Sequence, residues 1–124
     1  MAWYAAHSII SIRPTRRSKG KVLVYENVIL VEAKTDDEAR EKAQKHAQAA
    51  IVEDQTLTID GDPAISRFEG IRKLISVSNP WPLSQDGERP VDGTEITYSK
   101  FLLKDEGALI NLTEGKEVLI EYLE

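Results

Sequence analysis

The 124-residue sequence contains no cysteine and only two histidines, His7 and His46. Without cysteine the chain forms no disulfide bond and no thiolate metal site, and it is compatible with a reducing compartment. Two histidines are too few for a histidine-rich metal centre. We therefore expect the protein to use neither a metal ion nor another cofactor.

Long apolar runs and a basic excess are also missing. The apolar runs extend for about one helical turn, whereas a membrane-spanning helix needs about 20 apolar residues. The first residues lack the basic flank and the apolar core of a signal peptide. A formal net charge of −5 argues against a nucleic-acid-binding role. These features predict a soluble, cytoplasmic protein that binds neither membranes nor nucleic acid.

Sequence motifs of catalysis are absent as well. The chain contains no G-x-G-x-x-G or Walker loop for phosphates and no G-x-S-x-G elbow of a serine hydrolase. Acid–base pairs can still be assembled from residues far apart in a chain, so the absence makes an enzyme less expected without excluding one. We assign no catalytic residue from the sequence.

One stretch, residues 22–50, organises the predicted fold. Residues 22–31 are rich in β-branched side chains and apolar on both alternating faces, which is typical of a central strand covered on both sides. Thr35 and Glu38 form a capping box that starts a helix. Small residues then recur at helical spacing, at Ala39, Ala43, Ala47 and Ala50. The pattern predicts a central strand followed by a helix over residues 36–50 that lies close to the sheet.

Four further segments have the composition of strands, namely residues 3–12, 65–77, 94–103 and 118–123. The predicted order is therefore two strands, one helix and three strands. This order indicates an α+β fold with a four- to five-stranded, largely antiparallel sheet and one main helix packed on one face. No linker divides the chain, and we expect a single domain spanning residues 1–124.

A tryptophan between two prolines is the first candidate for a binding residue. Trp81 lies between Pro80 and Pro82 in an irregular segment, and the prolines stiffen it and keep it out of helix and sheet. Its ring can plug one end of the core. Alternatively, it can project as an anchor for a partner, a role in which tryptophan is enriched.

His46 and Tyr25 are two further candidates. At 100° per residue His46 falls between Ala39 and Ala43, on the inner side of the predicted helix. It is either a buried acid–base or ligand-binding residue or a packed histidine. Tyr25 begins a polar interruption of the predicted central strand, and its ring either packs at the core or edge or contributes to a ligand site.

Several sequence landmarks also occur in a fixed order. They are Trp3-Tyr4-Ala5-Ala6, Glu26-Asn27-Val28-Ile29-Leu30-Val31-Glu32-Ala33, Asp37-Glu38-Ala39, Phe68-Glu69-Gly70-Ile71, Asp92-Gly93-Thr94-Glu95-Ile96 and Tyr98-Ser99. Together they resemble a family of small bacterial proteins catalogued as a domain of unknown function. The resemblance spans residues 3 to about 103 and implies a stand-alone bacterial domain. It brings no activity and no catalytic residue.

Two hypotheses for the function remain. The first is a non-catalytic protein-binding or regulatory module, such as an inhibitor or immunity-type protein, and the acidic balance suits a basic partner. The alternative is a small-ligand-binding protein or a small enzyme, with a cleft between the helix and the long loops. A homodimer formed through an open sheet edge is a third possibility. A flat apolar patch would favour a protein partner, whereas a deep pocket with converging polar groups would favour a small ligand.

Overall fold

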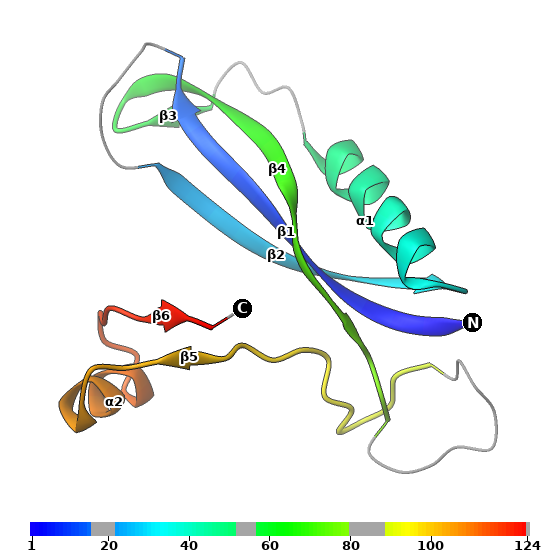
Figure 1. Cartoon of the computed structure of the whole chain (residues 1–124). Helices are drawn as coiled ribbons and strands as arrows, with labels where there is room; N and C mark the ends of the chain where they lie inside the picture. The colour runs from blue at the N-terminus through cyan, green and yellow to red at the C-terminus, as the bar shows by residue number, and fades with distance from the viewer. Residues whose placement is uncertain (16–21, 52–56, 80–88, 124) are drawn as a thin grey trace.

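A computed structural model describes residues 1–15, 22–51, 57–79 and 89–123. The elements follow in the order β1 (Ala2–Pro14), β2 (Leu23–Ala33), α1 (Asp36–Ala50), β3 (Thr58–Ile59), β4 (Asp62–Ser76), β5 (Phe101–Leu102), α2 (Glu106–Thr113) and β6 (Glu121–Tyr122). The main sheet is antiparallel, with α1 on one face (Figure 1). The predicted α+β class is confirmed.

The main sheet has four strands in the order β2-β1-β4-β3. β1 pairs with β2 without interruption, from Ala2 opposite Ala33 to Ile12 opposite Leu23. On its other side β1 pairs with β4, and the register shifts twice along that pairing. β3 contributes only two residues, which pair with the first two residues of β4.

The prediction that residues 22–31 form the central strand is wrong. β2 lies at one end of the strand order, whereas β1 and β4 are the two inner strands. The buried residues of β1 include three polar ones, His7, Ser8 and Ser11, whose side chains are hydrogen-bonded. The apolar residues on both faces therefore indicated a strand, but not its place in the sheet. Among the described residues β2 pairs with β1 alone, so it is an edge strand.

Helix α1 has the predicted bounds; three of the four alanines of the predicted core face are buried, whereas Ala50 is exposed. The Thr35 Oγ1 accepts a hydrogen bond from the Glu38 backbone N–H at 3.1 Å. The Glu38 carboxylate accepts from the Lys34 N–H at 3.1 Å, one residue earlier than in the predicted capping box. Ala39, Ala43 and Ala47 are buried, and their small side chains bring the helix close to the sheet.

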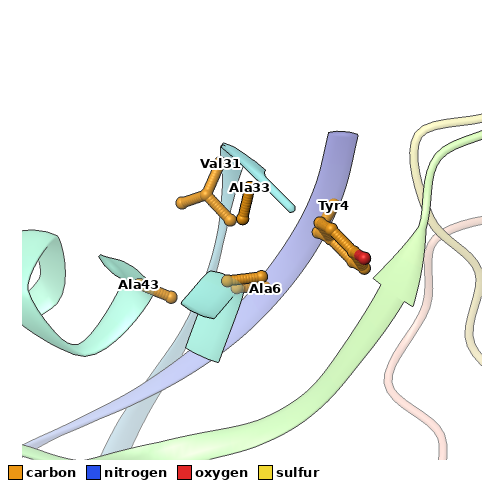
Figure 2. Packing of buried hydrophobic residues seen from close by; sticks show 6 residues of the cluster. Tyr4, Ala6, Val31, Ala33 and Ala43 are labelled. Carbon is orange, nitrogen blue, oxygen red and sulfur yellow. The ribbon is translucent and has the colours of Figure 1, made fainter. Parts of the chain in front are cut away.

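The core between α1 and the sheet is formed mainly by small side chains. Figure 2 shows Ala43 of the helix directed toward Ala6 of β1, with Val31 and Ala33 of β2 beside them. Tyr4 is the largest buried side chain in this cluster and is 6% exposed. Because the cluster contains few large side chains, the helix-to-sheet contact depends on close approach rather than on side-chain volume.

Residues 89–123, which we call the C-terminal arm, lie on the side of the sheet away from α1 (Figure 1). Only two residues of the predicted strand 94–103 and two of the predicted strand 118–123 form strands, as β5 and β6. The Phe101 and Tyr122 rings meet edge to face with centroids 5.8 Å apart, and this contact joins the two short strands. Neither described helix is long and apolar enough to span a membrane.

Candidate binding surface

The outer side of β2 is an exposed strand edge, and we call its residues 23–30 the β2 edge. Within the described part of the chain, β2 pairs with β1 alone. The strand has 11 residues and contains no proline, glycine, lysine or arginine, which are the residues that commonly guard a sheet edge. Five large apolar side chains on it are 40–51% exposed, namely Leu23, Val24, Tyr25, Val28 and Leu30. Backbone and side chains together therefore offer a surface for pairing with another strand.

Glu26 is the charged residue of the β2 edge, and its charge is directed onto the sheet face opposite α1. Arg72 of β4 holds its carboxylate with two hydrogen bonds, from Nε at 3.1 Å and from Nη2 at 2.9 Å. His7 Nδ1 of β1 is hydrogen-bonded to the same carboxylate. Burial raises the pKa of Glu26, but the hydrogen bonds and charges of Arg72 and His7 outweigh it and hold that pKa below its usual range. The glutamate therefore stays ionised and paired, and it does not guard the edge.

His7 links this network to the C-terminal arm. The ring is 2% exposed, and its Nε2 lies 2.5 Å from the Thr97 Oγ1 of the arm. Carboxylate, imidazole and hydroxyl thus follow one another as in a hydrolase triad. However, the imidazole is the general base of such a triad, and the His7 ring is buried between β1 and the arm. We therefore assign the three residues to holding the arm on the sheet.

Two cations on β4 make further contacts with the arm. The Arg72 guanidinium lies 4.7 Å from the centre of the Tyr122 ring, and the Lys73 ammonium lies 5.1 Å from that of Tyr98. Such cation–π contacts stabilise by roughly 0.5–1 kcal/mol at exposed sites. Beyond these contacts the arm exposes large apolar side chains, including Ile110 at 56% and Leu119 at 91%. The arm is thus anchored at a few points and exposes several large apolar side chains outside them.

Sequence patterns alone do not reveal the network of His7, Glu26 and Arg72. His7 and Glu26 are 19 residues apart, and Glu26 and Arg72 are 46 apart, so no local spacing reveals them. The hairpin register supplies the missing signal, because it places His7 opposite Val28. Glu26 is then the diagonal neighbour of His7 on the same face, within reach of a long side chain.

Two of the predicted site residues, Tyr25 and His46, lie in the part of the chain that the structure describes. Tyr25 lies on the β2 edge and is 51% exposed, so it belongs to the candidate surface. Trp81, Pro80 and Pro82 lie outside the described residues. His46 is exposed and not buried as predicted, although it lines a pocket between α1 and the sheet.

The reason for the exposure of His46 is a change in packing along α1. The first half of the helix contacts the sheet directly, whereas a pocket of about 280 Å³ lies between its C-terminal half and the sheet. Its described lining is mainly apolar, and it includes the polar residues Ser8, Asn27, His46 and Ser66. Its volume is slightly below the usual range for small-molecule sites, about 300–1,000 Å³.

Comparison with known proteins gives one match. A family model described as "Domain of unknown function (DUF4288)" matches residues 3–88. The matched region contains β1 to β4 and α1 and ends before the C-terminal arm. No curated protein and no solved structure matches the chain.

Proposed function

The chain belongs to the DUF4288 family, a domain of unknown function, and we propose that it is a non-catalytic protein-binding module that uses the β2 edge. One observation carries the proposal, namely an unguarded edge strand whose large apolar side chains are about half exposed. An exposed edge strand is a template for another extended segment. Main-chain hydrogen bonds then provide affinity, and alternate side chains provide specificity.

The exposed apolar side chains support the same function. Large apolar side chains of the β2 edge and of the C-terminal arm are exposed. Apolar side chains that gather on an exposed surface are typical of protein-interaction sites. The β2 edge also favours a protein partner over a small ligand, since the surface is a strand edge rather than a concavity.

A photo-crosslinking experiment in living cells tests the proposal. A photoreactive phenylalanine analogue replaces Tyr25 at the β2 edge, and a matched variant carries it at Gln44 on the exposed side of α1. We expect protein adducts from position 25 after irradiation, and far fewer from position 44. Equal or absent adduct formation at the two positions would contradict a binding role for the β2 edge.

The pocket beside His46 favours a second candidate function, the binding of a small and largely apolar molecule. Apolar walls with a few polar groups are the usual composition of such sites. A thermal-shift screen of small apolar compounds tests it, with His46→Ala as the weakened variant and Ala50→Leu as a variant that partly fills the pocket. Compounds that stabilise the wild type and both variants equally would argue against this site.

A further inference from the structure

We propose that the β2 edge binds a second copy of the chain, with the two β2 strands antiparallel and centred on Asn27. The pairing would join two four-stranded sheets into one eight-stranded sheet. This inference rests on the proposed function, because it names the partner of the same edge. It follows from three properties of β2: its symmetry, the positions of its charges, and its exposed apolar side chains.

Symmetry limits the possible registers. Two identical strands that pair in an antiparallel sheet are related by a twofold axis, so each residue contact occurs twice. Residues directly opposite one another must lie on the same face of the sheet. Since side chains alternate between faces along a strand, the axis must pass through a residue and not between two residues.

The charges on β2 select among these registers. Centring on Glu26 places the two Glu26 carboxylates opposite one another, and centring on Ile29 places Glu26 opposite Glu32; like charges in these positions are destabilising. Centring on Val28 engages Glu32, whose backbone carbonyl already accepts a hydrogen bond from the Lys42 ammonium at 2.5 Å. Centring on Asn27 avoids both conflicts and pairs residues 24–30 of one copy with residues 30–24 of the other.

This register also matches the exposed side chains. Val24 lies opposite Leu30 of the second copy, Tyr25 opposite Ile29, and Glu26 opposite Val28. Val24, Tyr25, Val28 and Leu30, each at least 40% exposed, thereby gain cross-strand neighbours, and apolar cross-strand pairs stabilise a sheet. The two Asn27 carboxamides meet at the axis, where each can donate a hydrogen bond to the other.

The exposed apolar side chains favour such a contact. A stable interface buries about 800 Å² of each partner. Leu23, Val24, Tyr25, Val28 and Leu30 are each 40–51% exposed, and a second copy placed against them would remove apolar surface from water.

Cysteine cross-linking tests both the partner and the register, because the natural sequence contains no cysteine. We expect Asn27→Cys to form a disulfide-linked dimer under mild oxidation, whereas Gln44→Cys on α1 stays monomeric. Val24→Cys alone and Leu30→Cys alone should not cross-link, since like positions would be about 20 Å apart along the strands. Their equimolar mixture should cross-link, because Val24 and Leu30 are opposite one another.

Sedimentation equilibrium of the unmodified chain supplies the second measurement, and circular dichroism confirms that each cysteine variant is folded. We expect a mass of twice 13.9 kDa. A monomeric mass, or cross-linking of Asn27→Cys no greater than that of Gln44→Cys, would overturn the inference. Photo-adducts of position 25 with other proteins only would also overturn it while leaving the proposed function intact. Absence of all adducts at position 25 would overturn both.

Discussion

The two edges of the main sheet are built from different residues. From Ile65 onward, β4 has no strand neighbour on its outer side among the described residues, so this part of β4 is also an edge. It carries four charged side chains, Arg67, Glu69, Arg72 and Lys73. The strand is also irregular, with register shifts against β1 and with Gly70 at a φ of 155°, a conformation that side-chain-bearing residues rarely adopt.

The β2 edge has neither the irregular backbone nor the several charges of β4. It is continuous in register with β1 and has one glutamate, which is held on the sheet face. Charges, bulges and irregular backbone prevent edge-to-edge pairing. The β4 edge is therefore protected by its own residues, whereas the β2 edge is the side of the sheet at which pairing with another strand is expected.

The largest expected effect comes from adding a guard to the β2 edge. Val24→Lys places a charge opposite Leu30 of the second copy, and the symmetry of the interface duplicates the change. Burial of each valine contributes about 1.5 kcal/mol, so the loss at two sites weakens self-association by about 100-fold. Sedimentation equilibrium measures the effect, and Gln44→Lys on α1 is the matched control. Unchanged self-association of Val24→Lys would remove the distinction between the two edges.

A smaller effect is expected from Glu26→Gln, which acts on the stability of the folded chain. The change removes the charge that Arg72 and His7 hold, and hydrogen bonds to charged groups contribute about 2 kcal/mol. Glu69 on β4 is the matched position, because it accepts one hydrogen bond from Ser11 at 2.7 Å and lies 3.8 Å or more from its cations. Glu69→Gln should cost clearly less in urea unfolding, and equal costs would show that the two glutamates do not differ in this way.

Lowering the pH should gradually reduce the contribution of the Glu26 carboxylate to the free energy of unfolding. The folded pKa of Glu26 lies below its usual range, because Arg72 and His7 outweigh the effect of burial. A carboxylate with a lowered folded pKa stabilises the fold above its unfolded pKa, about 4.3, and this stabilisation is lost as the pH falls through the folded pKa. The stability difference between wild type and Glu26→Gln should therefore shrink below about pH 4.3. A constant difference in urea unfolding across this range would contradict the assignment.

The smallest effect is expected from removing a guard at the β4 edge. Arg67 is 62% exposed and lies 4.0 Å from Glu69, so Arg67→Val should change the free energy of unfolding by no more than about 0.5 kcal/mol. It should, however, lower solubility, because it makes the β4 edge more similar to the β2 edge. Light scattering at increasing concentration measures this, with Arg67→Gln as the control. Equal solubility of both variants would mean that Arg67 does not guard this edge.

The two edges also show how far sequence patterns reach. The apolar side chains on both faces of residues 22–31 predicted a central strand, and a strand forms over Leu23–Ala33. The pattern could not indicate the place of this strand in the sheet, because apolar side chains indicate coverage of the faces and not which strands pair beside it. The predicted burial of His46 was wrong for a related reason. Helical periodicity gives the direction of its side chain, whereas the local separation between α1 and the sheet decides how exposed that side chain is.

The sequence by itself determined the local structure of this protein. Thr35 and the alanine stripe defined α1, because caps and helical spacing act over only a few residues. The tertiary structure alone decided the strand order, the position of β2 at the edge, and the meeting of His7, Glu26 and Arg72. Those features depend on strand register and on the shifts between β1 and β4, which are set by the packing of the whole sheet and not by any short stretch of residues.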